Sequence, residues 1–173
     1  MKAYDEIWGL AEDNFGIITS AQAEELGVSR QNMRKMTKSG LLMRLCHGVY
    51  QVKHHVPTTN DVYAAAVAMV GEKGYLRGAS VVALLNLVPT DPAFIYVGAA
   101  NRVRRRLPDG YVVRDMKDSE TTFYNGIRCQ KLMAALREAR EEGVIESDRI
   151  QTAVERANEE GLLTDEECSQ FKD

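Results

Sequence analysis

The sequence lacks long apolar runs, and none approaches 18 consecutive residues, so we expect no membrane-spanning helix. Residues 1–15 carry four acidic side chains and no apolar core, which is unlike a secretory signal peptide. Cysteine is scarce, since Cys46, Cys129 and Cys168 show no Cys-x-x-Cys spacing, and no Cys or His pair has the spacing of zinc ligands. We therefore expect reduced thiols, no metal and a cytoplasmic location.

Motifs of catalysis are also missing. No histidine lies near a Ser or Cys nucleophile motif, and the Gly71-x-x-Gly74 segment lacks the Lys-Ser/Thr of a phosphate-binding loop. Adjacent acid pairs such as Glu141 and Glu142 diverge by about 100° on a helix, so they form no paired site. The sequence predicts neither an enzyme nor a bound cofactor.

The charge that is present is distributed unevenly. The 173 residues, 45% of them hydrophobic, are enough for one medium or two small globular domains. The net charge is −3, yet residues 135–173 alone carry −7. Residues 26–60 contain no acidic residue, while they hold six Lys or Arg and all three histidines. This window predicts a surface that faces a polyanion, and the alternative is a solvated basic face.

The first 53 residues predict helix, helix, tight turn, helix and hairpin. Thr19 or Ser20 can cap the second helix, and Ser29 can cap the third. His47 and Gly48 form a two-residue hairpin turn. The predicted helices cover residues 4–14, 20–27 and 30–39, and the strand-like runs cover 41–46 and 49–52. This order is that of a winged helix-turn-helix.

The residues around the turn between the second and third helices suit the geometry of that turn. Ala23 is small where the two helices cross, and Gly27 can adopt the left-handed conformation that the turn requires. The residues predicted to pack the third helix inward are Leu26, Val28, Met33, Met36, Thr37 and Gly40. The opposite face carries Gln31, Arg34, Lys35 and Lys38. Such a face suits phosphates and base edges, although a helical hairpin with a solvated outer face fits the same pattern.

The remainder of the chain predicts a mixed domain that ends in helices. Residues 54–59 have the composition of a linker. Further helices are expected over 61–70, 79–87, 131–142, 146–159 and 165–171, and strands over 75–76, 94–97, 111–114, 121–124 and 127–129. The predicted fold class is α+β, with a winged helix-turn-helix over 1–53, a linker over 54–59 and a small α+β domain over 60–173.

Residues 17–52 resemble the N-terminal domain of the AbiEi antitoxins of type IV toxin–antitoxin systems. The resemblance is carried by Gly16-Ile17-Ile18-Thr19, by Leu26-Gly27-Val28-Ser29-Arg30, and by Gly40 to Leu45 leading into Gly48-Val49-Tyr50. It continues more weakly to the end of the chain. It implies a transcriptional repressor that binds inverted repeats of double-stranded DNA at its own promoter. It also implies a C-terminal domain that opposes a nucleotidyltransferase-like toxin.

We expect the DNA contacts to come from the third helix and the hairpin. Ser29 caps the positive end of that helix, where backbone N–H groups can hold a phosphate. The candidates for base edges or nearby phosphates are Arg30, Gln31, Asn32, Arg34 and Lys35. Lys38, Arg44 and His47 are the candidates for backbone contacts.

A second basic feature is a loop predicted between two strands. It contains Arg102, Arg104, Arg105 and Arg106, which could contact phosphate or an acidic partner, or could simply be solvated. Two alternatives to the main hypothesis stay open: a protein-interaction module whose winged helix no longer binds DNA, and a repressor without a toxin partner. The sequence leaves the operator, any effector and the oligomeric state open, a homo-oligomer included.

Overall fold

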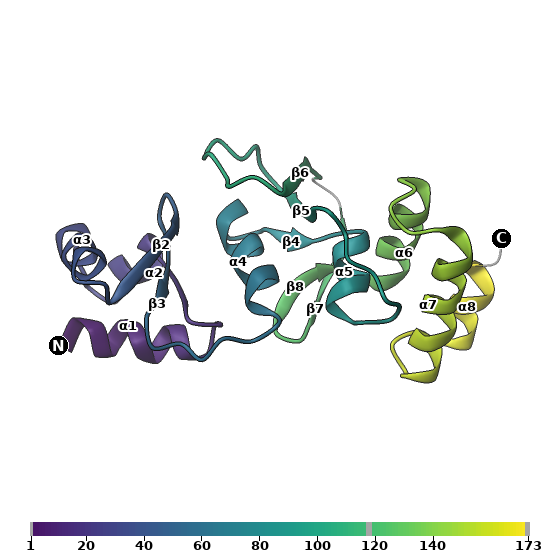
Figure 1. Ribbon diagram of the computed structural model, residues 1–173, viewed down its shortest axis with the longest axis horizontal. Helices are drawn as coiled ribbons and strands as arrows, with labels where there is room; N and C mark the ends of the chain where they lie inside the picture. The colour runs from purple at the N-terminus through teal and green to yellow at the C-terminus, as the bar shows by residue number, and fades with distance from the viewer. Residues whose placement is uncertain (1, 117–118, 172–173) are drawn as a thin grey trace.

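The computed structural model describes residues 2–116 and 119–171, and its first part is a winged helix-turn-helix (Figure 1). Its elements are α1 (Lys2–Glu12), β1 (Ile17–Thr19), α2 (Ser20–Glu25), α3 (Arg30–Lys38), β2 (Leu42–Cys46) and β3 (Val49–Val52). The strands form an antiparallel sheet in the order β1-β3-β2, in which β2 and β3 make the wing. The predicted α+β fold class is confirmed.

Local hydrogen bonds fix the helix starts and the turn. Thr19, not Ser20, caps α2: its hydroxyl accepts from Gln22 N at 3.2 Å, and the Gln22 side chain accepts from Thr19 N at 2.9 Å. The Ser29 hydroxyl accepts from Asn32 N at 3.2 Å and caps α3 as predicted. Gly27 lies between the two helices at φ +76°, the left-handed conformation expected of it.

A small apolar cluster holds the three helices on the sheet. It contains Ile7, Ala11, Ile18, Ala23, Val28, Met33, Met36, Leu42 and Val52. The pattern predicts Leu26 in this core and Gly40 on the inner face of α3, and both predictions are wrong. Leu26 is 36% exposed because it is the C-cap of α2, and Gly40 is exposed because it follows the last turn of α3 at φ +77°.

The rest of the chain forms a five-stranded mixed sheet with helices. Its elements are α4 (Asp61–Val70), β4 (Tyr75–Leu76), α5 (Ala79–Leu84), β5 (Ile95–Ala99), β6 (Tyr111–Asp115), β7 (Thr121–Tyr124), β8 (Ile127–Gln130), α6 (Leu132–Glu141), α7 (Ser147–Glu159) and α8 (Asp165–Phe171). The strand order is β6-β5-β4-β8-β7, in which β5 with β6 and β4 with β8 are parallel pairs. The helix expected over 79–87 ends at Leu84, because Asn86 takes a left-handed φ of +50°.

The winged sheet also packs on the second part of the molecule. Ile18 and Val52 face the cluster beneath α1–α3, whereas Ile17 and Val49 belong to the larger core that includes α4. Successive strand residues point to opposite faces, so both faces of this short sheet are covered. The winged helix is therefore docked against α4 rather than tethered at a distance.

Residues 54–59, expected to be a linker, are anchored at their start by His54 and His55. Nδ1 of His54 lies 3.0 Å from the Tyr4 hydroxyl of α1. Nε2 of His55 lies 2.8 Å from a carboxylate oxygen of Asp61, at the start of α4. The domain boundaries at 53 and 60 stay a prediction, but the segment between them is anchored.

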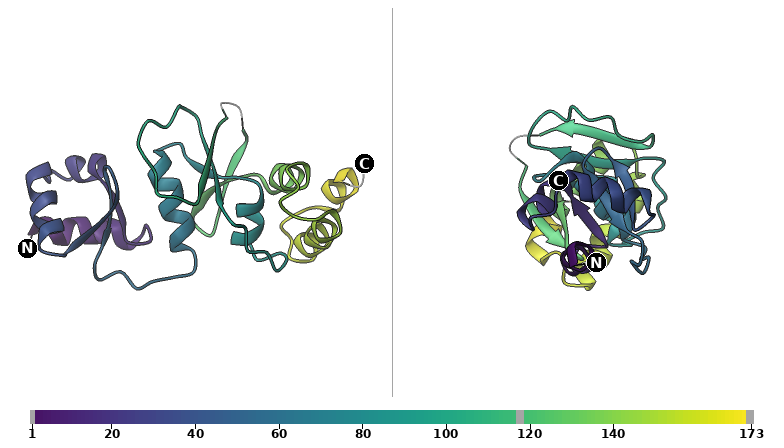
Figure 2. Two further views of the ribbon diagram at one scale, coloured as in Figure 1. Left: turned by 45° about the horizontal axis from the view of Figure 1, so that its top comes forward. Right: turned by 90° about the vertical axis from the view of Figure 1, so that its left-hand side faces the viewer.

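The molecule is elongated, with α3 near one end and α7 and α8 at the other (Figures 1 and 2). The acidic C-terminal helices thus lie far from the basic helix α3. Among the described residues, no helix combines the length and the apolar character needed to cross a membrane.

Candidate nucleic-acid interface

The outer face of α3 is a continuous basic and polar surface. Met33 and Met36 point inward and are 2% and 8% exposed. All of the helix residues predicted to contact DNA are exposed: Arg30, Gln31, Asn32, Arg34, Lys35 and Lys38. The helix contains no acidic side chain. Its exposed face can therefore approach a polyanion without a like-charge penalty from its own residues.

Arg30 differs from the other basic residues because it already has a partner. Its Nε lies 2.8 Å from a carboxylate oxygen of Glu24 on α2. The two side chains are 80% and 50% exposed, so water screens the pair and its contribution to the stability of the fold is small. Arg30 can thus exchange this carboxylate for a phosphate at little cost.

The wing presents its two predicted contacts together. Arg44 donates through Nη2 to Nδ1 of His47 at 3.0 Å and through Nε to the carbonyl of Cys46 at 3.3 Å. Arginine has no acceptor atom, so His47 Nδ1 is unprotonated in this arrangement. A bulge between Arg44 and Cys46 shifts the register of β2 against β3. Arg44 and His47 are both exposed at this end of the hairpin.

The loop between β5 and β6 holds the other predicted basic cluster. Arg102, Arg104 and Arg106 are exposed, and Arg105 is half-buried. Within residues 2–116 and 119–171, none of the four forms an ion pair. The structure places this loop outside the winged helix, so α3 and the wing form one group and the four arginines a second.

A buried polar network has no counterpart in the sequence-based predictions. Arg77 is fully buried directly after β4, and its Nη1 donates to Glu138 Oε1 and, at 3.2 Å, to Glu142 Oε1 on α6. Gln130 at the end of β8 donates to Glu138 Oε2 at 2.8 Å and accepts from Gly78 N at 3.0 Å. The network ties the strand end at β4, the end of β8 and helix α6 to one another.

Two further side chains complete that network. The guanidinium of Arg77 lies 5.3 Å from the centre of the Tyr96 ring, and Arg114 of β6 pairs with Glu142 at 2.5 Å. Two arginines face two glutamates in this cluster, so their formal charges balance. The i, i+4 spacing of Glu138 and Glu142 puts both carboxylates on one face of α6, but no local signal identifies Arg77 as their partner.

The described part of the chain holds no cluster of three or more His, Cys, Asp or Glu that could bind a metal ion. Burial raises the pKa of the Cys129 thiol to about 12, so this thiol stays protonated and unreactive at neutral pH.

Comparison with known families agrees with the geometry. Residues 10–53 match the family model described as a transcriptional regulator, AbiEi antitoxin. The resemblance is thereby confirmed for a segment that contains α2, α3 and the wing, and so all nine of the predicted contacts on these elements. No curated protein matches the chain.

Proposed function

We propose that the protein is a sequence-specific, double-stranded-DNA-binding repressor of its own promoter. The observation that carries this proposal is the acid-free, fully exposed polar face of α3, presented by a winged helix-turn-helix. The family description of residues 10–53 as a transcriptional regulator supports it.

In this proposal α3 enters the major groove. Gln31 and Asn32 have the paired donor and acceptor that read adenine, and Arg34 has the fork that reads guanine. Lys35 lies within reach of base edges or the nearest phosphates. The backbone N–H groups at the start of α3, next to Ser29, bind a phosphate, and Lys38 binds another.

The wing contributes contacts to the flanking backbone. Arg44 and His47 lie at the exposed end of the hairpin, where a wing meets the phosphates beside the major groove. Inverted repeats require two copies of the chain related by a two-fold axis, with half-sites about 34 Å apart or a multiple of this. We therefore propose that the operator is occupied by a pair of chains.

The C-terminal part carries the proposed antitoxin role. Helices α7 and α8 hold several of the acidic residues in the chain and lie at the end opposite to α3 (Figure 1). They offer a surface to a basic partner without obstructing DNA. We propose that this partner is a nucleotidyltransferase-like toxin, encoded by a neighbouring reading frame.

A gel-shift titration with the DNA upstream of the coding sequence tests the repressor function. The test variant is Arg30→Ala/Arg34→Ala/Lys35→Ala/Lys38→Ala in the full chain. We expect it to melt like the parent and to bind about 1,000-fold more weakly, at about 1 kcal/mol for each of the four side chains. These side chains are exposed and contribute little to stability.

The matched control removes four positive charges elsewhere. Lys73→Ala/Arg137→Ala/Arg149→Ala/Arg156→Ala has the same net charge as the test variant and leaves α3 and the wing intact. It should bind like the parent. Unchanged binding by the α3 variant would refute the assignment of α3, and a parent that shifts no upstream DNA would favour a protein-interaction module.

A further inference from the structure

We infer that the arginine loop, residues 100–110 between β5 and β6, is a second phosphate-binding contact that extends the DNA interface beyond the wing. This inference rests on the proposed function, because it needs a duplex seated on α3 and the wing. The family match ends at residue 53 and does not reach this loop.

The composition of the arginine loop favours an anion. It holds four arginines against one acidic residue, Asp109. Unlike Arg77 and Arg114, which pair with carboxylates of α6, the arginines of the loop have no carboxylate partner within the described residues. Guanidinium groups bind phosphate through paired N–H donors, so an exposed row of them suits a nucleic-acid backbone.

The arginine loop is fixed to the fold by apolar residues within it and directly after it. Val103, Leu107 and Tyr111 are partly buried and pack against the larger core. Arg104 and Arg106 lie between Val103 and Leu107 in the sequence, Arg102 directly precedes Val103, and all three arginines are exposed. This arrangement directs the charged side chains outward from a docked segment, which lowers the entropic cost of their binding.

The end of the arginine loop lies next to the wing. Pro108 and Tyr111 line a cavity of about 590 Å³ together with Met43 and Leu45 of β2, so the end of the arginine loop adjoins a wing strand. Figure 1 shows the loop projecting from the same edge of the molecule as the β2–β3 hairpin. A duplex that contacts the wing can therefore continue past the loop.

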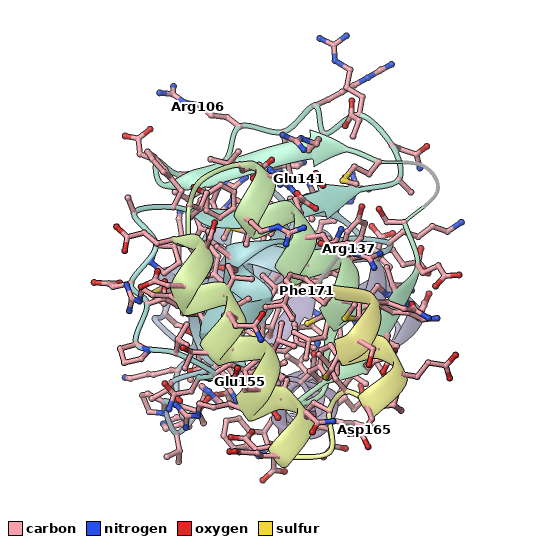
Figure 3. All side chains as sticks on the ribbon, turned by 90° about the vertical axis from the view of Figure 1, so that its right-hand side faces the viewer. Arg106, Arg137, Glu141, Glu155, Asp165 and Phe171 are labelled. Atoms are coloured by element: carbon pink, nitrogen blue, oxygen red, sulfur yellow. The ribbon has the colours of Figure 1, made fainter. Side chains whose placement is uncertain are left out.

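Glu155 of α7 and Asp165 of α8 lie away from the arginine loop, whereas Asp109 lies within it and Asp115 lines a cavity together with Arg102 and Arg105. Figure 3 labels Arg106 at one edge, with Glu155 of α7 and Asp165 of α8 toward the opposite edge. An acidic protein bound to the arginine loop would also compete for the edge that the wing presents to DNA. The shared edge therefore favours DNA as the ligand of this loop.

The test compares two duplexes by fluorescence anisotropy over a range of salt. Both come from the DNA upstream of the coding sequence; the short one spans the footprint of α3 and the wing, and the long one adds about 10 bp, one helical turn, at each end. The parent should bind the long duplex more tightly, and its log K against log salt should be steeper by about 2 to 3 for each bound chain. This corresponds to about 0.9 for each added phosphate contact.

The loop variant is Arg102→Ala/Arg104→Ala/Arg106→Ala, and Arg137→Ala/Arg149→Ala/Arg156→Ala is its charge-matched control. The loop variant should bind the two duplexes equally, with the affinity of the parent for the short one, whereas the control should behave like the parent. A loop variant that keeps the parental preference for the long duplex overturns the inference alone.

Two other outcomes are also decisive. A parent that binds neither duplex overturns the proposed function and this inference with it. Parental DNA binding by the loop variant, combined with loss of association with the neighbouring gene product, overturns the inference and assigns the arginine loop to a protein partner.

Discussion

At the scale of single residues, Gly27 shows how a backbone requirement determines the amino acid. Its φ is +76°, and a Cβ placed on it would meet no heavy atom within 4 Å. A side chain there is therefore opposed by the conformation and not by crowding. We expect Gly27→Val to lower the free energy of unfolding by about 1–2 kcal/mol or more, measured by urea denaturation.

Gly9 provides the matched control for that change. It lies inside α1, has ordinary helical φ and likewise has open space around its Cβ position. Gly9→Ala should raise the free energy of unfolding by about 0.5–1 kcal/mol, because alanine restricts the unfolded chain and favours the helix. A Gly27→Val protein as stable as the parent would show that the left-handed turn is not needed.

Whereas Gly27 is required by its local backbone conformation, Arg77 is required by partners that are far away in the sequence. Arg77→Met leaves the carboxylate of Glu138 buried without its main partner, and we expect a decrease of about 3–5 kcal/mol in the free energy of unfolding. Arg77→Met/Glu138→Met removes both charges and should recover a large part of that decrease. Urea denaturation of the two single variants and the double variant measures the coupling.

Additive effects in that cycle would mean that the two side chains do not stabilise the fold as a pair. A double variant with recovered stability would also show whether the network contributes to DNA binding. We expect no contribution, since Arg77 and Glu138 lie on neither α3 nor the wing. The affinity of the double variant for the upstream DNA should equal that of the parent.

At the scale of elements, the anchoring of residues 54–59 depends on pH. Burial would raise the pKa of Asp61, but hydrogen bonds from the side chain and backbone of Thr58 and from His55 outweigh it, so the pKa of Asp61 is lowered. The unfolded chain then binds the proton more readily than the folded one. Asp61 therefore stabilises the fold above its unfolded pKa, near 3.9, and this contribution is lost as the pH falls through the lower folded value.

Asp61→Asn tests the direction of this pH dependence of stability. The difference in unfolding free energy between the parent and this variant should be largest near pH 6 and should shrink below about pH 4. Asp13→Asn is the control, because Asp13 is exposed and forms no hydrogen bond or ion pair among the described residues. A difference for Asp61→Asn that stays constant from pH 6 to pH 2.5 would contradict the account.

The elements that the sequence predicts best are those with local signals. Ser29, Gly27 and the His47–Gly48 turn act within a few residues of themselves, so α3 and the wing could be located from the pattern alone. Leu26 could not be placed, because whether a C-cap residue faces the core depends on how the helices cross. The Arg77 network could not be predicted either, since Arg77 is separated from its partners Glu138 and Glu142 by 61 and 65 positions in the sequence.

At the scale of the whole molecule, the two kinds of charge occupy opposite ends. The basic face of α3 and the acidic helices α7 and α8 are separated along the long axis (Figure 1). Charges further apart than the screening length, about 8–10 Å, interact weakly at physiological salt. The separation allows DNA and a basic protein to bind the same chain, which the two proposed roles require.

Part of the candidate site could be predicted from the sequence. The basic window over residues 26–60 predicts a surface on α3 and the wing, and the exposure of these side chains agrees with that expectation. The docking of the winged sheet on α4 through Ile17 and Val49 could not be predicted, because a residue buried against a distant element looks like any other strand residue.

The salt dependence of binding to the upstream duplex tests the central claim most directly. If α3 and the wing neutralise about four to six phosphates in each chain, log K should fall with log salt at a slope of about −4 to −5 for each bound chain, and at about twice this slope when a pair of chains binds the inverted repeats. In the variant without the basic side chains of Arg30, Arg34, Lys35 and Lys38, the slope should become shallower by about 0.9 for each phosphate that is no longer neutralised. Equal slopes for parent and variant would contradict the account, because DNA binding would then not depend on α3.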